Sequence, residues 1–300
     1  MTVPGIPESL RRFCTDMAPL WPLTSMRVGG PARWLAQPQT EDDVQLILGW
    51  IEAQSLPVVI LGGGTNVLFP DDGFAGVVVL TKRLKGARAE GLTVTAMCGE
   101  PLSDFARRLD GAGLSGMEWA CGIPGTVGGA VVMNAGTANG DIASVLSSVR
   151  LLTSQGLREM TADELQLGYR TSALLNGEID EVVLDATFTL REEDHRNCER
   201  REREALEDRR RTQPTGASCG CIFKNPATGP SAGELLDRAG CKGMRIGAAS
   251  VSELHANFIL NEGTNNANDV FGLIEVMREH VIERQGIVLQ QEVKIITQQV

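Results

Sequence analysis

Three side chains capable of polar chemistry stand among neutral or apolar neighbours in this 300-residue sequence: Arg170 in G-Y-R-T-S, Cys221 in G-C-I-F and Glu292 in Q-Q-E-V. An arginine can stabilise a carboxylate, a thiol can donate a proton, and a glutamate can take part in acid–base work. Each also has an ordinary structural explanation: anchoring of a backbone carbonyl, filling of a strand, or the exposed face of an edge strand. Spacing alone does not bring the three together.

Two glycine-rich stretches offer backbone N–H groups rather than side chains. Gly62 to Asn66 reads G-G-G-T-N after an apolar run, and the stretch from Cys121 to Gly136 contains five glycines and no charged residue. Such stretches can approach a phosphate or pyrophosphate closely, or they can be buried turns. The first is neither a Rossmann fingerprint nor a Walker loop, because it lacks a helix-opening G-x-G-x-x-G and a following lysine. The presence of both stretches favours one shared ligand.

Composition limits the classes of partner. The formal net charge of −10 argues against a nucleic acid or an anionic membrane surface, since both require a basic footprint. The 7 cysteines form no C-x-x-C pair and no Cys/His cluster with zinc spacing, so we expect no metal. Neither a signal-peptide core nor a membrane-length apolar run is present, which predicts a reduced, cytoplasmic protein without membrane insertion.

Hydrophobic periodicity outlines the elements that must position these residues. It predicts strands over 57–61, 76–80, 92–97, 145–153, 157–160, 181–190, 221–223, 257–260 and 287–297. It predicts helices over 41–51, 101–109, 231–239 and 268–285. The mixed-charge run 191–211 predicts a further helix with almost no apolar face, which we interpret as a solvated connector at a domain boundary.

Taken in order, the motifs resemble those of the UDP-N-acetylenolpyruvoylglucosamine reductase (MurB) family over nearly the whole chain. The matching segments are R-V-G-G at 27–30, L-G-G-G-T-N-V-L at 61–68, G-I-P-G-T-V-G-G-A at 122–130, N-A-G at 134–136, G-Y-R-T-S at 168–172, G-C-I-F-K-N-P at 220–226 and Q-E-V at 291–293. Each is modest alone, but the ordered set is specific. With a single tyrosine, Tyr169, the chain resembles the shorter subtype that lacks a tyrosine-bearing loop.

The resemblance implies an α+β protein: a two-subdomain FAD-binding fold of vanillyl-alcohol oxidase type plus a C-terminal α/β substrate-binding domain. We expect FAD-binding subdomains over 1–82 and 83–192, the charged helical connector over 193–212 and the substrate-binding domain over 213–300. We also expect a monomer that acts on a UDP-sugar. The implied biological role is peptidoglycan precursor synthesis, and through it cell wall biogenesis, cell shape and cell division.

The implied reaction is a hydride relay. NADPH reduces non-covalently bound FAD, and the enolpyruvyl ether of the UDP-sugar then receives the hydride in the same cleft. In the family an arginine and a C-terminal glutamate stabilise the charge that develops on the substrate, and these positions are Arg170 and Glu292 here. The carboxylate helps only if it is protonated or hydrogen-bonded. A hydroxyl in the G-S-x-F-K-N-P motif then donates a proton to carbon.

The sequence departs from the common pattern at that proton donor, because the serine position is Cys221. The ordinary pKa of a thiol, about 8.5, is far below that of a serine hydroxyl, so the thiol gives up its proton more easily. We interpret Cys221 as a working acid rather than as a lost site.

The resemblance also assigns binding residues. The expected substrate contacts are Tyr169, Lys224, Asn225 and His255, although a packed histidine explains His255 equally well. The residues expected to bind FAD come from the two glycine-rich stretches: Gly62, Gly63, Gly64, Thr65, Asn66, Val67, Gly122, Ile123, Pro124, Gly125, Thr126, Gly128, Gly129, Ala130, Asn134 and Gly136.

Two alternatives remain at this point. One is a flavin oxidase of the same fold, disfavoured because none of the 3 histidines lies in a glycine-rich stretch where covalent flavin attachment would be expected. The other is a binding module that kept the fold and lost catalysis, disfavoured by the retained Arg170, Cys221 and Glu292. A redox role for Cys219 is open, because alternation in a strand would place it beside Cys221 whereas Gly220 suggests a turn.

Overall fold

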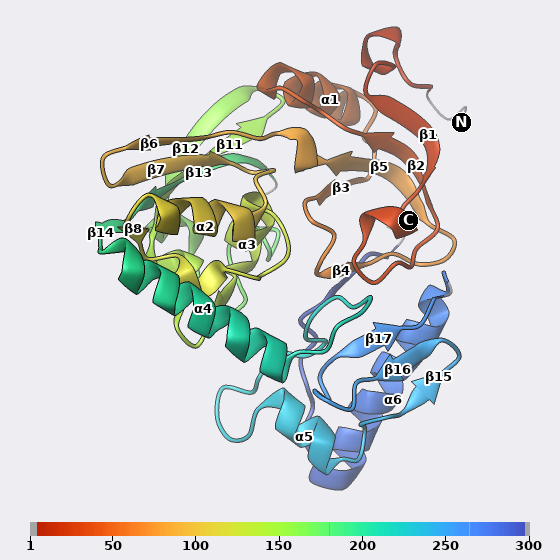
Figure 1. Cartoon of the computed structure of the whole chain (residues 1–300). Helices are drawn as coiled ribbons and strands as arrows, with labels where there is room; N and C mark the ends of the chain where they lie inside the picture. Colours follow the sequence, from red (N-terminus) through yellow and green to blue (C-terminus); the bar gives the residue numbers. More distant parts are fainter. Residues whose placement is uncertain (1–4, 180, 264, 298–300) are drawn as a thin grey trace. The chain divides into compact units, whose positions relative to one another are not determined.

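The computed structural model describes residues 5–179, 181–263 and 265–297 (Figure 1). By compactness the described chain divides into two units. Unit 1 comprises the described residues of Met1–Asp16, Trp34–Gly63 and Gly76–Arg209, and unit 2 comprises those of Met17–Arg33, Gly64–Ala75 and Arg210–Val300. Helices and sheets occur in both, which confirms the α+β class. The four segments expected from the sequence, 1–82, 83–192, 193–212 and 213–300, stay a prediction.

Unit 1 contains most of the strands and four of the α-helices. The helices are α1 (Glu41–Ala53), α2 (Leu102–Gly111), α3 (Val127–Met133) and α4 (His195–Thr212). The strands that lie in it wholly or in part are β1 (Cys14–Pro19), β2 (Pro31–Ala36), β3 (Val58–Leu61), β5 (Phe74–Leu80), β6 (Ala87–Glu90), β7 (Thr93–Met97), β8 (Leu114–Ser115), β9 (Gly136–Thr137), β10 (Gly140–Asp141), β11 (Leu146–Thr153), β12 (Gly156–Thr161), β13 (Val182–Thr189) and β14 (Arg191–Glu192).

An antiparallel sheet with the order β12–β11–β13–β7–β6 forms the centre of unit 1 (Figure 1). The predicted strands 145–153 and 157–160 are confirmed as β11 and β12, which form a hairpin with Thr153 opposite Gly156 across its turn. Apolar side chains of α2 and α3 pack against this sheet in one core, which includes Phe105 against Phe188 at a ring-centroid distance of 5.7 Å. Burial of that apolar area is the main force that holds the two helices on the sheet.

A second core in unit 1 lies between α1 and the sheet ordered β1–β2–β5–β3. Helix α1 begins where the sequence predicts, because the Thr40 side chain accepts from the Asp43 N–H and the Asp43 carboxylate accepts from the Thr40 N–H. Its inward face packs Trp50 edge-on against Trp34, with ring centroids 5.3 Å apart. In the same sheet β3 runs parallel to β5 and ends immediately before Gly62.

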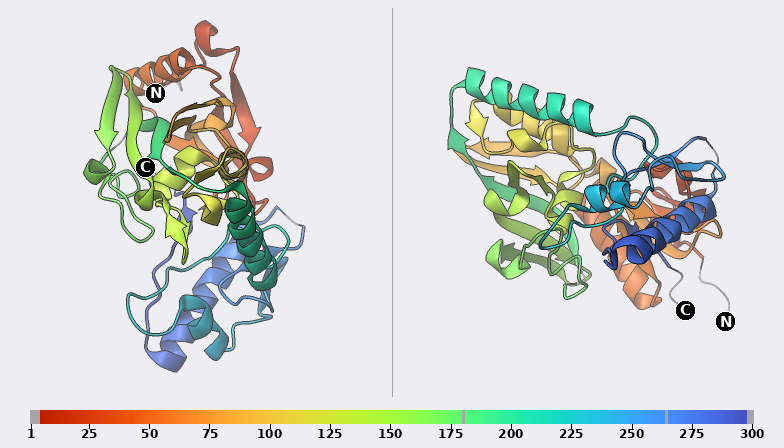
Figure 2. Two further views of the ribbon diagram at one scale, coloured as in Figure 1. Left: turned by 60° about the vertical axis from the view of Figure 1, so that its left-hand side comes forward. Right: turned by 90° about the horizontal axis from the view of Figure 1, so that it is seen from below.

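The highly charged helix α4 is not a purely solvated connector. It runs beside α2 (Figure 2), where Arg107 of α2 donates to Glu202 of α4 at 3.0 Å. Cys198 on its inner face is fully buried, and Leu206 packs against the main core of unit 1. The predicted helix with almost no apolar face is therefore confirmed, and two apolar residues two turns apart make up the face that packs on unit 1.

Arg201 fixes α4 electrostatically. Its guanidinium donates to the buried Glu118 carboxylate at 2.7 and 2.9 Å, and Glu118 also accepts from the Ser115 hydroxyl and the Gly116 N–H. Burial opposes the ionisation of Glu118, but these hydrogen bonds outweigh it and lower its pKa. Asp110, nearby on α2, lacks such donors; burial, with the Glu118 charge second, raises its pKa to about 7.

Unit 2 contains α5 (Ala232–Arg238), α6 (Ala267–Gln285), β4 (Val67–Leu68), β15 (Arg245–Ile246), β16 (Ala249–Val251), β17 (Ile259–Asn261) and β18 (Lys294–Ile295). The core of this unit joins α5 and α6 with the sheet β15–β16–β17 (Figure 1). The Asp71 carboxylate accepts from the N–H groups of Ala267 and Asn268, so a residue of the short segment 64–75 helps to cap α6.

Two expected strands of unit 2 are wrong in extent. The segment 221–223 makes only isolated bridges, from Cys221 to Phe258 and from Phe223 to Gln291. Of the expected strand 287–297, only β18 is regular. Both segments pair with short partners through single bridges. The apolar alternation in the sequence indicates an extended chain but does not reveal how few residues have a pairing partner. Among the described residues, no helix has the length and apolarity needed to cross a membrane.

The substitution Asp110→Asn should abolish one component of the pH dependence of stability. The Asp110 pKa rises from 3.8 to about 7 on folding, so the folded chain holds a proton that the unfolded chain has lost between these values. Stability therefore falls as pH rises through this window, by on the order of 2–4 kcal/mol in total. We expect the variant to gain more stability relative to the wild type at pH 8 than at pH 5, because pH 5 lies only partway into this window.

Urea unfolding at both pH values, with a chelator present so that no metal ion contributes, measures this difference. Asp104→Asn is the matched control, because Asp104 lies on the same helix with its side chain 62% exposed. An equal gain at pH 5 and pH 8 for the Asp110 variant would contradict the expected difference in proton binding between the folded and the unfolded chain.

Candidate functional site

The two glycine-rich stretches meet at Gly62. This residue lies so close to Thr126 that a Cβ atom at position 62 would be 2.5 Å from the Thr126 hydroxyl. Both residues belong to unit 1, and Gly62 directly follows the parallel strand β3. The two stretches are therefore in contact at Gly62 and Thr126, and the shared ligand expected from the sequence stays a prediction. No other residue type fits at position 62 without displacing the Thr126 side chain.

Thr126 begins a short helix that the sequence pattern concealed. Its hydroxyl caps α3 by accepting from the Gly129 N–H, and its carbonyl accepts from the Ala130 N–H. The N–H groups of Gly125 and Thr126 donate to no acceptor within residues 5–179, 181–263 and 265–297. Thr126 is nevertheless 4% exposed. Two consecutive open donors at the first turn of a helix suit an anion such as a pyrophosphate.

Several of the other glycines are explained by packing within the protein. A Cβ atom at Gly128 would lie 2.7 Å from Cys98, and one at Gly122 would lie 2.8 Å from Leu206 of α4. One at Gly136 would lie 2.5 Å from Asp141. These positions thus require glycine whether or not a ligand binds. Gly129 is different, because the closest atom to its Cβ position is the Thr126 hydroxyl at an unstrained 3.6 Å.

The rest of the first stretch, Gly64 to Val67, belongs to unit 2. Gly64 has a φ of +68°, and a Cβ atom there would lie 2.0 Å from the Leu23 carbonyl oxygen, so the turn itself requires glycine. The Asn66 amide donates to the Glu292 carbonyl at 3.3 Å, and Val67 in β4 pairs with Lys294 in β18. This half of the stretch is therefore tied to the segment that carries Glu292.

Arg170 is held in a fixed orientation in unit 1. Its backbone adopts a left-handed conformation, with φ +52°, and its guanidinium donates to the carbonyls of Gly136 at 2.6 Å and Asn134 at 3.3 Å. The guanidinium also lies over the ring of Tyr169, 5.4 Å from its centroid. The Tyr169 ring is 55% exposed. The arginine is thus positioned by the end of the second glycine-rich stretch.

Asn134 holds the loop that carries Arg170 in position, in addition to its place in the second glycine-rich stretch. It ends α3 in the left-handed conformation, with φ +40°. Its buried side chain donates to the Gly168 carbonyl at 2.8 Å and accepts from the Ala143 N–H at 2.9 Å. Ser172 adds a hydrogen bond from its hydroxyl to the Val132 carbonyl at 2.6 Å. The sequence signal for this role is an asparagine directly after an apolar helix.

In unit 2, Cys221 and Glu292 belong to adjacent backbone segments. The Glu292 N–H donates to the Ile222 carbonyl at 2.8 Å. The Asn257 side chain accepts from the Phe223 N–H through its oxygen and donates to the Phe223 carbonyl through its nitrogen. The segment 221–223 is thus held on both sides, and the structure brings together two predicted residues that are distant in sequence. Cys221 itself is half-buried.

Cys219 does not share the environment of Cys221. It is 2% exposed, and burial, followed by the charges of Cys221 and Glu292, raises its pKa to about 12. Gly220 between the two cysteines has a φ of +79°, which is a turn and not a strand. The turn alternative is therefore correct, and Cys219 is a protonated core residue at neutral pH.

The remaining expected substrate residues lie around this segment. The Lys224 N–H donates to the Gln290 carbonyl, and the exposed Asn225 accepts from the Ala232 N–H at the start of α5. His255 accepts from the Asn257 N–H through Nδ1, and burial and then Lys242 lower its pKa, so its ring is neutral at pH 7. The structure thus gathers Lys224 and Asn225 beside Cys221, whereas His255 has a local structural role as well.

Comparison with known proteins agrees with this geometry. The family profile for the UDP-N-acetylenolpyruvoylglucosamine reductase C-terminal domain matches residues 212–296, and the profile of an FAD binding domain matches residues 32–161. The reductase of Synechococcus sp. (strain JA-3-3Ab) is 44% identical over 93% of this chain and 89% of its own length. That of Chloroflexus aggregans is 41% identical over 96% of this chain and 99% of its own.

The substitution Gly62→Ala should weaken FAD binding by about ten-fold or more. The new methyl group would displace the Thr126 side chain, which caps α3 next to the two open N–H groups. Stability of the cofactor-free protein should fall by about 1–3 kcal/mol. Flavin fluorescence titration and thermal unfolding measure the two effects.

Gly49→Ala is the control, because nothing lies within 4 Å of its Cβ position in the middle of α1. It should stabilise the protein by about 0.5–1 kcal/mol and leave FAD affinity unchanged. Unchanged FAD affinity in the Gly62 variant would show that the approach to Thr126 does not shape the binding site.

A solved structure extends the likeness to three dimensions. The crystal structure of the reductase from Thermus caldophilus superimposes with a TM-score of 0.78 at 34% identity, covering 95% of this chain and 98% of that one. Sequence and fold therefore agree over essentially the full length. This chain belongs to the UDP-N-acetylenolpyruvoylglucosamine reductase (MurB) family.

Proposed function

We propose that this protein reduces UDP-N-acetylglucosamine enolpyruvate to UDP-N-acetylmuramate with NADPH and bound FAD, in peptidoglycan precursor synthesis. The observation that carries the proposal is the likeness to reductases at 40% to 44% identity over nearly the whole chain. The match of residues 32–161 to an FAD binding domain supports a flavin as the hydride carrier. NADPH as the hydride source follows from the resemblance of the motifs.

The second glycine-rich stretch would hold the diphosphate of FAD. The open N–H groups of Gly125 and Thr126 offer two donors to anionic oxygens, and Gly62 leaves room beside them. We assign the neighbouring residues of both stretches to the same site: Gly63, Gly64, Thr65, Asn66, Val67, Gly122, Ile123, Pro124, Gly128, Gly129, Ala130, Asn134 and Gly136. A bound flavin supplies the chemistry of accepting a hydride from a nicotinamide and passing it to carbon.

Arg170 would stabilise negative charge on the substrate. Hydride addition to C3 of the enolpyruvyl group places negative charge at C2, beside the substrate carboxylate. The Arg170 guanidinium is already fixed by two backbone carbonyls, so little reorganisation is needed when that charge develops.

Cys221 would donate the proton that completes the reduction. The thiol proton moves to C2 of the substrate, and the resulting thiolate regains a proton from water. Glu292, on the adjacent backbone segment, would assist by hydrogen bonding to the same reacting group. The neighbouring Cys219 cannot replace Cys221, because it is buried and holds its own proton firmly.

The UDP-sugar would be bound mainly by unit 2. Lys224 would contact the diphosphate and Asn225 the uracil, while His255 would offer a neutral ring nitrogen. Tyr169 of unit 1 presents an exposed aromatic ring suited to stacking or hydrogen bonding. These four contacts rest on the motif resemblance and on the positions just described.

The variants Cys221→Ser and Cys221→Ala should separate proton transfer from flavin reduction. The serine variant keeps a donor in place and should retain substantial turnover. The alanine variant should still be reduced by NADPH at the normal rate, but product formation should slow by about 10²–10⁴-fold, which is the usual contribution of a general acid. Stopped-flow absorbance of the flavin follows each half-reaction separately.

Cys241→Ala is the matched control, because it removes another buried thiol of unit 2. It should leave both half-reactions unchanged. Full turnover by Cys221→Ala would remove Cys221 from the mechanism without affecting the proposed reaction class.

An anaerobic titration tests the reaction class itself. NADPH alone should bleach the flavin absorbance, and later addition of the enolpyruvyl UDP-sugar should restore it as hydride leaves for carbon. An oxidase of the same fold would regain absorbance with oxygen and not with the UDP-sugar. Flavin that NADPH reduces but the UDP-sugar fails to reoxidise would overturn the proposed function.

A further inference from the structure

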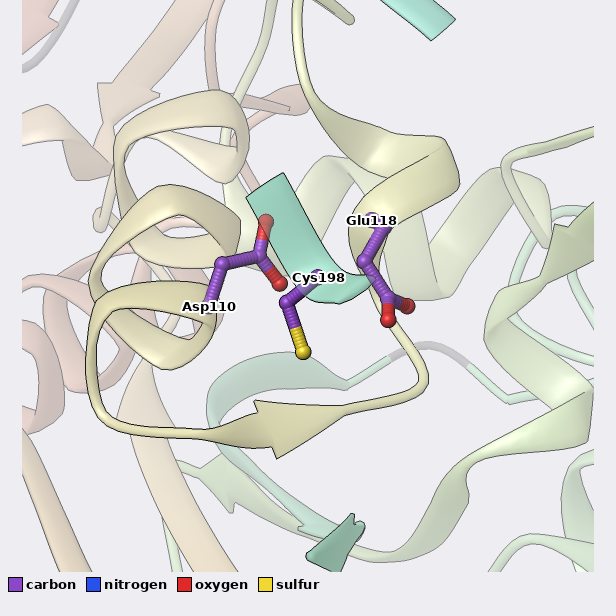
Figure 3. Close-up of side chains that lie close together, drawn as sticks. All are labelled: Asp110, Glu118 and Cys198. Atoms are coloured by element: carbon purple, nitrogen blue, oxygen red, sulfur yellow. The ribbon is translucent and has the colours of Figure 1, made fainter. Parts of the chain in front are cut away.

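A cluster of carboxylates and thiols lies away from the residues assigned to the reaction, where α4 packs against α2. Asp110 comes from α2, Glu118 and Cys121 from the 3₁₀ turn Glu118–Ala120 and the residue after it, and Cys198 and Glu202 from α4. We call these five residues the α2–α4 cluster. Asp110, Glu118 and Cys198 place potential ligand atoms within 4.8 Å of one another (Figure 3), and so do Asp110, Cys121 and Glu202.

The two groups of the cluster differ in how their charges are balanced. Arg201 already saturates Glu118, whose two oxygens together accept from Arg201, Ser115 and the Gly116 N–H. The same guanidinium reaches the Cys198 sulfur at 3.9 Å. A cation bound between these two residues would have to displace the arginine. The group of Asp110, Cys121 and Glu202 is not blocked in this way, because within the described residues its one salt bridge joins Glu202 to Arg107, whose side chain is 50% exposed.

Asp110 is the second observation that points to a ligand. Its side chain is buried, with the residue 1% exposed, and Oδ1 has no hydrogen-bond partner within the described part of the chain. Oδ2 accepts only a long hydrogen bond from the Cys121 thiol, at 3.5 Å. An ionised carboxylate in such surroundings is costly unless a proton or a cation compensates it. Figure 3 shows this carboxylate directed toward Cys198.

We propose that Asp110, Cys121 and Glu202 bind a thiophilic divalent cation, for which Zn²⁺ is the best match, and that the bound ion fastens α2 and α4 to the first residue of the second glycine-rich stretch. One sulfur and two carboxylate oxygens suit Zn²⁺, whereas Mg²⁺ and Ca²⁺ select oxygen alone. Cys198 or water completes four-fold coordination. On binding, the Cys121 S–H bond breaks, the sulfur binds the metal, and the proton leaves to solvent.

The site has a structural consequence for unit 1 and is independent of the proposed reaction. Cys121 immediately precedes Gly122, which lies against Leu206 and Arg209 of α4. A bound ion would therefore stiffen the start of the second glycine-rich stretch, four to five residues before Thr126. It would also replace the proton that Asp110 holds in the metal-free protein.

Co²⁺ titration of chelator-treated holoenzyme tests the proposal, because a thiolate bound to Co²⁺ gives a charge-transfer band in the near ultraviolet. We expect that band to saturate with a single Co²⁺, to disappear on addition of Zn²⁺, and to accompany proton release. Cys121→Ser should abolish it, and Asp110→Asn should weaken Co²⁺ binding by about ten-fold or more. Cys14→Ser, a buried thiol of unit 1 outside the cluster, should leave the titration unchanged.

X-ray absorption of the Zn²⁺-loaded wild type gives a readout that needs no variant, and sulfur together with oxygen in the first coordination shell is the expected result. The proposal is overturned by a wild type that shows no thiolate band with excess Co²⁺, or by coordination through oxygen and nitrogen alone. It is equally overturned if the band survives in Cys121→Ser and is lost in Cys221→Ala, which would place the ion at the half-buried thiol of unit 2.

Discussion

The approach of Gly62 to Thr126 is the constraint on which the rest of unit 1 depends. Because position 62 carries no side chain, the turn after β3 can lie against the residue that caps α3. The cap sets where α3 begins, and so which N–H groups are left open at Gly125 and Thr126. The same helix ends at Asn134, whose side chain holds the loop of Arg170. A single close contact thus determines both the turn with the two open N–H groups and, through one short helix, the orientation of a charged side chain.

In unit 2, hydrogen bonds to the backbone rather than a regular sheet hold the segment around Cys221 in position. The chain around Cys221 has little regular structure, yet the Asn257 amide and the Glu292 N–H fix it on two sides. Such contacts define a position more sharply than burial does, since a hydrogen bond is directional whereas apolar packing is not. This suits a proton donor, which works only within hydrogen-bond reach of the carbon that it serves.

The charged helix α4 shows how composition can mislead about burial. Most of its residues are charged, but Cys198 and Leu206 lie on the face that meets α2 and the glycine-rich stretch. Arg201 then couples that face to Glu118 inside unit 1. Asp110 remains without a comparable donor, and this imbalance distinguishes the α2–α4 cluster from the other charged contacts of the helix. The charged residues on this face of the helix therefore make specific contacts with unit 1 and are not all surrounded by solvent.

The sequence alone predicted the long periodic elements, such as α1 with its capping box, the β11–β12 hairpin and α6, because their signals are local. It also identified the family, because ordered motifs survive in linear form. It did not predict α3 or the partners of the inner face of α4, and it left the turn at Gly220 as one of two alternatives. These depend on contacts between residues distant in the chain: Gly62 with Thr126, Glu292 with Ile222, and Arg201 with Glu118. The sequence determined which chemical groups are present, and only the tertiary structure decided which are held, buried or left with an open hydrogen bond, since those properties arise from neighbours in space.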